Sequence, residues 1–429
     1  MMRIFKNPPK DTWEDLCKRP LTDSAEFNSL VRDILGRVKN EGDNALRYYS
    51  ERFDHISISD FKISEDELNE AENHVSDDLK NAIRIASDNI YRFHESQVRD
   101  EEAVETMPGV KCWRKNVAIE KAGLYIPGGS APLFSSVLML GIPAKIAGCR
   151  RVIICTPPDR QGKINPLILY AAKITGISEI FRVGGAQAIA AMAYGTESVP
   201  RVNKIFGPGN QYVTKAKEMA ASEGTAVDMP AGPSEVLVIA GSQADPEFVA
   251  SDLISQAEHG PDSQVILLTD SGKLLSEVSE QITGQLEKLP RKDIAALSLD
   301  NSMAILLQNI DECIEFSNEY APEHLVINTD DPHRLARKVI NAGSVFLGKY
   351  TCESAGDYAS GTNHTLPTNG AARSFSGVST DSFLKKITFQ ELSREGIEKL
   401  GPVIEIMALA ENLSGHAEAV SIRLNSLKE

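Results

Sequence analysis

Apolar residues recur at helical spacing in the first part of the chain. Between residues 24 and 98 they fall three or four positions apart, which places them on one face of an α-helix. Ser64 and Glu67 add a capping box, a pair typical of a helix start, just ahead of an apolar residue. The spacing is clearest at Leu30, Val31, Ile34 and Val38. The pattern predicts a helical N-terminal region over residues 1–110.

Beyond Trp113 the pattern changes to short β-rich runs that end at glycine or proline and are followed by helical stretches. This alternation is typical of βαβ units and a parallel sheet. The runs lie at residues 152–155, 180–183 and 204–206, and then at 235–240, 265–268 and 344–347. We therefore expect two α/β domains, residues 111–233 and 234–380. A C-terminal segment, 381–429, is expected to be helical, with Thr388 and Glu391 as a second capping box.

A metal site is one interpretation of the polar residues in the second domain. Asp245, Pro246 and Gly260 fit the start and end of a helix from Pro246 to His259. Gln256 and His259 share one face of it. With Asp357 and His416 they offer nitrogen and oxygen donors, which suit Zn²⁺, with Mn²⁺ and Co²⁺ as close competitors. An ordinary polar cluster at a helix end is the alternative.

An acid–base pair is a second candidate. Glu323 and His324 follow Pro322, and such a pair can take protons from an alcohol and from water. A solvated turn is the alternative. The polar, glycine-rich segment 356–364, which contains Asp357 and His364, is typical of a site loop. The remaining histidines lie in charged, helical surroundings and are expected at the surface: His55, His74, His94 and His333.

Glycine-containing turns follow several of the strand-like runs. Glycine lets the backbone approach a ligand, and a helix N-terminus can meet a phosphate. The turns are Gly128-Gly129, Gly184-Gly185 and Gly207-Pro208-Gly209-Asn210, and none matches GxGxxG. A cofactor could bind at the carboxyl ends of such strands, and a plain tight turn is the alternative. The composition of residues 228–235 predicts a stiff connection between the two domains. The same connection could place Ser234 in the cleft between them, where small-molecule sites are concentrated.

The composition narrows the class of partner. The 429 residues carry a formal charge of −15, and 42% of them are hydrophobic, enough for more than one core. An acidic surface repels nucleic acid and anionic lipid, so we expect neither a nucleic acid nor a membrane as partner. The six cysteines show no CxxC spacing, and no apolar signal segment follows the polar start. We expect a cytoplasmic protein that acts on a small molecule.

Seven motifs, in this order, resemble those of the histidinol dehydrogenase family, and the resemblance covers almost the whole chain. They are Leu124 to Gly129, Val183 to Gln187, Gly207 to Asn210, Pro230 to Ser234, Ser255 to Gly260, Pro322 to Leu325, and Gly356 to His364. The resemblance implies a four-electron oxidation of L-histidinol to L-histidine through histidinaldehyde, with two NAD, at the end of histidine biosynthesis. It also implies an α/β fold with two incomplete Rossmann-like, three-layer domains similar to those of aldehyde dehydrogenases.

The resemblance further implies roles for individual residues. One Zn²⁺ per subunit would be bound by Gln256, His259, Asp357 and His416. Glu323 and His324 match the family's catalytic acid–base pair. NAD contacts are implied for Tyr125, Gln187 and Asn210. Histidinol contacts are implied for Ser234, His364 and Glu411, together with Gln256, His259, His324, Asp357 and His416. The family works as a homodimer, and its C-terminal segment reaches the partner's site.

Other functions stay open at this point. A dehydrogenase of the same fold could oxidise another polar alcohol, such as a sulfonated or hydroxylated propane diol, although His364 and Glu411 suit an imidazole. A zinc hydrolase is another alternative, but it would not explain Tyr125, Gln187 and the glycine turns. A non-catalytic metal-binding scaffold would take up metal and turn over no alcohol.

Overall fold

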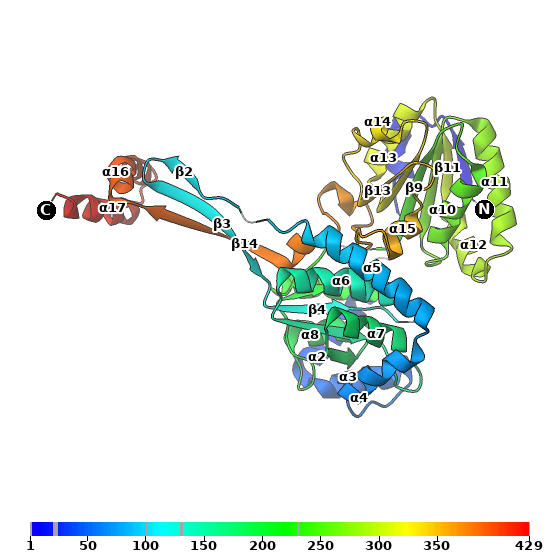
Figure 1. Cartoon of the computed structure of the whole chain (residues 1–429), viewed down its shortest axis with the longest axis horizontal. Coiled ribbons are helices and arrows are strands. Elements are labelled where there is room, and N and C mark those ends of the chain that lie inside the picture. Colours follow the sequence, from blue (N-terminus) through cyan, green and yellow to red (C-terminus); the bar gives the residue numbers. More distant parts are fainter. Residues whose placement is uncertain (1, 20–24, 100, 129–131, 230–231, 429) are drawn as a thin grey trace. The chain divides into compact units, whose positions relative to one another are not determined.

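The chain forms two compact units in this computed structural model, which describes residues 2–19, 25–99, 101–128, 132–229 and 232–428 (Figure 1). Unit 1 comprises Met1–Gln97 and Ile119–Phe383, and unit 2 comprises Val98–Ala118 and Leu384–Glu429. Gly129, Pro230 and Ala231, which belong to the sequence motifs, lie outside the described residues. The domain limits expected from the sequence stay a prediction.

Unit 1 contains a five-stranded parallel sheet of order β6-β5-β4-β7-β8. Its strands are β4 (Lys121–Tyr125), β5 (Arg151–Thr156), β6 (Glu179–Arg182), β7 (Lys204–Phe206) and β8 (Ala226–Val227). Alternate side chains of β5 enter different cores, Ile153 on one face and Ile154 on the other. One face packs on α2 (Ala25–Glu41), α3 (Asp43–Tyr49), α8 (Gly185–Tyr194) and α9 (Gln211–Ser222). The other packs on α4 (Glu65–Glu70), α5 (Asp77–Glu95), α6 (Phe134–Ala147) and α7 (Pro166–Thr175).

Unit 1 also contains a six-stranded parallel sheet of order β1-β11-β10-β9-β12-β13. Its strands are β1 (Arg3–Lys6), β9 (Glu235–Ala240), β10 (Gln264–Thr269), β11 (Met303–Leu306), β12 (His324–Asn328) and β13 (Ser344–Leu347). One face packs on α10 (Pro246–Ala257), α11 (Gly272–Leu286) and α12 (Lys292–Asp300). The other packs on α1 (Trp13–Leu16), α13 (Ile310–Tyr320) and α14 (Pro332–Ala336).

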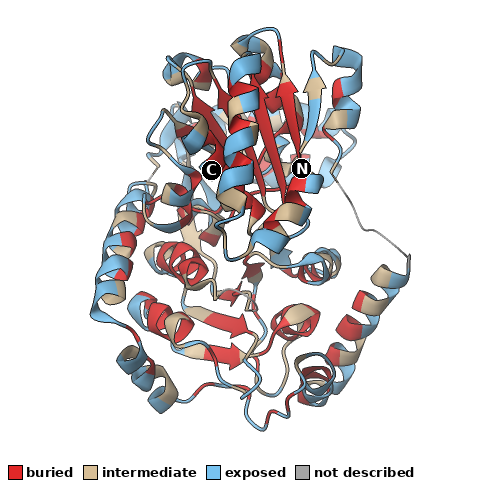
Figure 2. Cartoon of the chain, turned by 90° about the vertical axis from the view of Figure 1, so that its right-hand side faces the viewer, coloured by how far each residue is buried: buried red, intermediate tan, exposed pale blue. Residues whose placement is uncertain are grey.

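Burial on both faces explains the composition of these strands. Every residue of β9, β10 and β12 is buried, and the central strands are red in Figure 2. A parallel sheet covered by helices on both faces needs nearly continuous apolar runs, which is the pattern that the sequence displays. No helix in the described part of the chain has the length and apolar character needed to cross a bilayer.

Unit 2 is a three-stranded antiparallel sheet of order β14-β3-β2 with two helices. Its elements are β2 (Val104–Met107), β3 (Val110–Ala118), β14 (Leu384–Leu392), α16 (Arg394–Ala410) and α17 (Ser414–Ser426). The predicted capping box at Thr388 and Glu391 is wrong, because both residues lie in β14. Pairing with β3 satisfies the backbone there, and Phe389 stacks on Trp113 at 5.5 Å between ring centroids. The helix begins later, capped by Ser393.

Other local predictions can be compared with the structure. The Ser64–Glu67 capping box is confirmed at the start of α4. The helix expected to end at His259 ends two residues earlier, at Ala257. The surface position expected for His94 is wrong, because this residue continues the apolar face of α5 and is fully buried. Its Nδ1 lies 2.8 Å from the Ile90 carbonyl oxygen.

Candidate active site

The predicted acid–base pair lies at the amino end of β12. His324 is the first residue of this strand and pairs with Val236 of β9 and Ser344 of β13. Glu323 and His324 are only 6% and 3% exposed, so the solvated-turn alternative is wrong. The backbone packs tightly here: a Cβ at Gly343 would lie 2.5 Å from the carbonyl oxygen of Glu323. The pair is therefore held in a fixed, buried position.

Glu235, the first residue of β9, contacts both members of this pair through its backbone. Its N–H donates to Glu323 Oε2 at 2.8 Å. Its carbonyl oxygen lies 3.1 Å from His324 Nδ1, the distance of a hydrogen bond in which the ring nitrogen is the donor. That bond leaves Nε2 as the ring nitrogen that can accept a proton.

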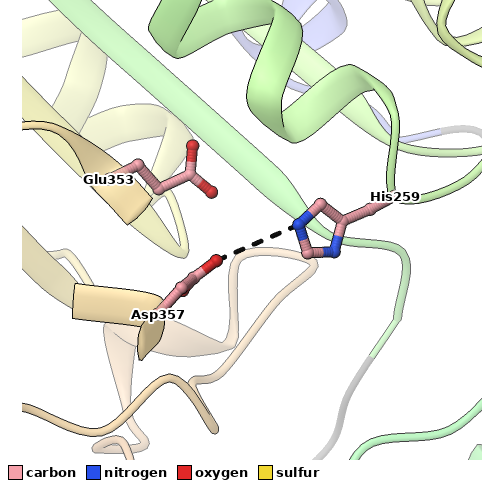
Figure 3. A group of neighbouring side chains, drawn as sticks. All are labelled: His259, Glu353 and Asp357. Atoms are coloured by element: carbon pink, nitrogen blue, oxygen red, sulfur yellow. Dashed lines mark ion pairs between the residues drawn. The ribbon is translucent and has the colours of Figure 1, made fainter. Parts of the chain in front are cut away.

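A cluster of possible metal ligands lies beside the pair. His259 follows the end of α10, and α15 (Glu353–Tyr358) carries Glu353 and Asp357. One ligand atom from each of these residues lies within 4.8 Å of the others, and Figure 3 shows the carboxylates and the imidazole turned toward a common centre. His259 Nε2 is 3.9 Å from Asp357 Oδ2. Asp357 was expected in a loop and lies instead in this short helix.

Asp357 connects the acid–base pair to the ligand cluster. Its Oδ1 lies 3.4 Å from His324 Nε2, and its backbone oxygen is 2.9 Å from His364 Nδ1. The other ring nitrogen of His364 lies 3.0 Å from the hydroxyl of Ser136, at the start of α6. Residues from α6, β12 and α15 are thus linked through Asp357 and His364.

Several buried polar atoms at this place make no hydrogen bond. They are both amide atoms of Gln256, Nε2 of His324 and Oε1 of Glu353, as judged among the described residues. Buried polar atoms in proteins are nearly always paired, so a group of orphans points to a bound ion, ligand or water. Neutral imidazole, amide oxygen and carboxylate are a donor set for a divalent cation of the zinc type.

Burial and close charges shift the acidities in the cluster. Burial raises the pKa of Glu323 to about 8. Burial alone would lower the pKa of His324, but the carboxylates of Glu323 and Glu353 outweigh it and raise that pKa to about 10. Burial would raise the pKa of Asp357, yet the imidazole of His324 holds it below its usual value. Desolvation lowers the pKa of His259. Both His259 and Asp357 therefore favour the proton-free form that a metal requires.

The three residues expected to contact NAD line one cavity of about 480 Å³ in unit 1. Tyr125 ends β4, Gln187 lies in the first turn of α8, and Asn210 caps α9 by accepting from the N–H groups of Tyr212 and Val213. The cavity thus lies at the carboxyl ends of the five-stranded sheet, where α/β proteins bind ligands. A Cβ at Gly207, whose φ is +121°, would lie 2.0 Å from the carbonyl oxygen of Tyr125. This turn requires glycine.

The remaining predicted site residues are placed as follows. Ser234 is partly buried and precedes β9, and its carbonyl accepts from the Gln264 N–H at 3.1 Å. Glu411 and His416 belong to unit 2, at the end of α16 and in α17, and both are exposed. Their roles stay predictions. The sequence reasoning missed Glu353, which lies four residues before Asp357 and so shares its helix face.

Comparisons with known proteins match the whole chain. A family model described as histidinol dehydrogenase matches residues 17–424. Histidinol dehydrogenase from Bacteroides thetaiotaomicron is 57% identical over 428 residues, with 100% of each chain covered. The crystal structure of histidinol dehydrogenase from Elizabethkingia anophelis is 54% identical with a TM-score of 0.97, covering 100% of this chain and 99% of that chain.

A more distant match concerns the fold alone. An acetylating aldehyde dehydrogenase from Geobacillus thermoglucosidasius is 14% identical with a TM-score of 0.50, covering 89% of this chain and 94% of that chain. The aldehyde-dehydrogenase-like α/β fold expected from the sequence is confirmed.

Proposed function

Because the chain belongs to the histidinol dehydrogenase family, we propose that it oxidises L-histidinol to L-histidine through histidinaldehyde, at the end of histidine biosynthesis, and reduces two NAD. The observation that carries the proposal is the buried pair Glu323–His324, with His324 Nε2 3.4 Å from Asp357 in a chain that matches the family over residues 17–424. An alcohol dehydrogenation needs such a base, close to a group that fixes the substrate.

The metal part of the proposal is one Zn²⁺ per subunit, held by Gln256, His259, Asp357 and His416. The orphaned amide of Gln256 and the proximity of His259 and Asp357 support this donor set. When bound, the ion would supply a fixed positive charge that orients the amine and imidazole of the substrate. Glu353 lies within ligand distance of the same cluster and offers a further oxygen.

The substrate would be oriented by polar groups around this centre. His364 is held between the Asp357 backbone oxygen and the Ser136 hydroxyl, which supports a role in contacting an imidazole-bearing molecule. Ser234 and Glu411 are proposed as further contacts. Fixing the carbinol carbon in this way can lower the barrier by several kcal/mol, about 7 at high effective molarity.

His324 is proposed as the base of the first oxidation. Its Nδ1–H donates to the Glu235 carbonyl, so Nε2 is directed toward Asp357. The positive charge of the bound ion would lower the pKa of His324, which the neighbouring carboxylates raise, and Nε2 would then take the hydroxyl proton. NAD supplies the hydride acceptor, and its binding site would be the cavity lined by Tyr125, Gln187 and Asn210. The N-terminal ends of α8 and α9 line this cavity at Gly185 and Asn210, and the positive ends of their helix dipoles would attract its phosphates.

Glu323 is proposed as the base of the second oxidation. It would take a proton from the water that adds to the aldehyde, and the resulting hydrate would lose its hydride to a second NAD. A carboxyl with a pKa of about 8 gains and releases protons near neutral pH, as a general base requires.

We also propose a cytoplasmic homodimer in which α16 and α17 form part of the interface. Exposed apolar residues are concentrated on these helices, which supports a partner surface. They include Val403, Ile406, Met407, Leu409, Leu413 and Ile422. In such a dimer Glu411 and His416 would act on the partner's site.

The direct test is the stoichiometry of NADH formed per histidinol consumed. We expect two NADH per histidinol, no turnover after chelation, and recovery when Zn²⁺ is added back. A stoichiometry of one, or full activity of the chelated protein, would contradict the proposal. A propane diol tested in parallel serves as the control for a different polar alcohol.

A further inference from the structure

A buried ion pair supports the backbone that holds the acid–base pair. Glu235 offers its N–H to Glu323 and its carbonyl to His324, so the orientation of this one residue sets both side chains. Glu235 is also the first residue of β9, so the regular strand continues from it in one direction only. Its side chain is bound to Arg19, far away in sequence.

Arg19 reaches Glu235 by two parallel hydrogen bonds. Nε donates to Oε1 and Nη2 to Oε2, each at 2.9 Å, and the two side chains are only 9% and 2% exposed. The N–H of Asn369 adds a third bond to the carboxylate at 2.9 Å. A two-point contact of this kind fixes direction as well as distance.

Arg19 also holds the other segment that leads into the pair. Its Nη2 donates to the Tyr320 carbonyl at 2.8 Å, and the guanidinium lies 3.5 Å from the centre of the Tyr320 ring. Tyr320 ends α13, three residues before Glu323. Arg19 therefore joins the start of β9 to the chain that enters β12, the two segments that meet at the acid–base pair.

We propose that the Arg19–Glu235 ion pair is a positioning device for Glu323 and His324, an inference that rests on the proposed function. A buried ion pair is weak evidence for stability, since an apolar pair of similar volume is often as stable. Its value here is geometric. It fixes the Glu235 peptide, keeps His324 Nδ1 as the donor, and leaves Nε2 directed at the substrate.

The test compares three variants of the full-length, zinc-loaded enzyme. R19Q/E235Q removes both charges together, so neither stays buried without its partner. R19K keeps the charge and loses the two-point contact. R151Q is a control for the two-point geometry alone, because Arg151 makes such a contact with Glu179 at the amino ends of β5 and β6, where the two side chains are 40% and 26% exposed.

We expect kcat to fall roughly 10- to 100-fold in R19Q/E235Q, in line with a small misplacement of reacting groups, while KM for histidinol and NAD and the zinc content stay unchanged. R19K should recover part of kcat, and R151Q should keep all of it. Unchanged kcat in both Arg19 variants, or a rise in KM alone, overturns the proposal. If the double variant does not fold, kcat and KM of R19K alone test the proposal, with a lower kcat at unchanged KM as the expected result.

Crystal structures of the same proteins separate this inference from the proposed function. The contact of His324 Nδ1 with the Glu235 carbonyl, 3.1 Å here, should persist in the wild type and R151Q and lengthen or vary in R19Q/E235Q. An unchanged contact overturns the positioning role, whether or not histidinol is the substrate. If the wild-type enzyme does not oxidise histidinol, the proposed function is overturned, but the structural comparison still tests the positioning role.

Discussion

Gln256 is a fully buried amide whose oxygen and nitrogen both lack a hydrogen-bond partner among the described residues. Without an ion such a residue destabilises the fold, and with an ion it becomes a ligand. Q256L should therefore raise the free energy of unfolding of the metal-free protein by about 1–3 kcal/mol. It should weaken Zn²⁺ binding about 100-fold, because a metal contact is lost. Denaturant titration in chelator and competition with a zinc indicator measure the two effects.

The control for this prediction is Gln264, a buried glutamine that is fully paired. Its amide donates to the Asn301 carbonyl at 3.0 Å and accepts from the Tyr320 hydroxyl at 2.6 Å. Q264L should lower the free energy of unfolding by about 1–3 kcal/mol, because it leaves two partners unsatisfied. Destabilisation of the metal-free protein by Q256L as well would argue against an ion at Gln256.

Glu323 is predicted to serve the second oxidation more than the first. E323Q should slow the oxidation of isolated histidinaldehyde about 100- to 10,000-fold, the usual contribution of a general base. The oxidation of histidinol to the aldehyde should change far less, because His324 retains its ring geometry. Single-turnover NADH formation with each substrate measures the two steps. Equal slowing of both would contradict this division of roles.

Asp54 is a partly buried acid that lines the cavity proposed for NAD. Burial raises its pKa from 3.8 to about 6. Its contribution to stability is therefore fully present below about pH 3.8 and is lost as the pH rises through about 6. D54N should raise the free energy of unfolding at pH 7.5 by about 1 kcal/mol, after a discount for partial exposure, and by less at pH 5. An equal gain in the free energy of unfolding at pH 7.5 and pH 5 would contradict the raised pKa of Asp54.

At the scale of elements, the turn after β7 depends on a single glycine. G207A combines a φ of +121° with a Cβ placed 2.0 Å from the Tyr125 carbonyl oxygen. We expect a loss of about 3 kcal/mol or more in stability, together with a higher KM for NAD. Gly148 is the control, because it has a positive φ of +81° and nothing within 4 Å of an added Cβ. G148A should cost only about 1–2 kcal/mol. Thermal unfolding compares the two variants.

The sequence predicted those elements whose burial is reflected in the apolar pattern of their own residues. The strands β5, β9 and β10 are apolar because both of their faces are covered. The strands β1 and β14 are largely exposed and carry no such run. Their formation depends on distant partners, as in the pairing of Ile4 with Ala304, which no local pattern reveals.

The site could be predicted only in part, for a related reason. The motifs supplied His259, His324 and Asp357, but periodicity did not show that α10, β12 and α15 converge. Glu323 is buried although its local sequence is polar, and its backbone is packed closely against Gly343, a tertiary contact that the local pattern does not reveal. Glu353 could have been found from its spacing of four residues to Asp357.

At the scale of the whole molecule, the proposed dimer makes a test of shared sites possible. H324Q and H416N should each inactivate a homodimer. Mixed after unfolding and refolding, they should recover roughly a quarter of wild-type activity, because each heterodimer then keeps one intact site. No recovery would contradict the action of His416 on the partner's site. Light scattering on each sample confirms that dimers are compared.

The polarity of β12 has a practical consequence. Glu323 and His324 stand where the strand begins, and Ser234 and Glu235 stand where β9 begins. Most α/β enzymes are redesigned through the loops that leave their strands. Here a library aimed at a new alcohol should instead vary substrate-facing positions in the segments that enter β9 and β12, such as Ser234, and keep Glu235, Glu323 and His324 unchanged.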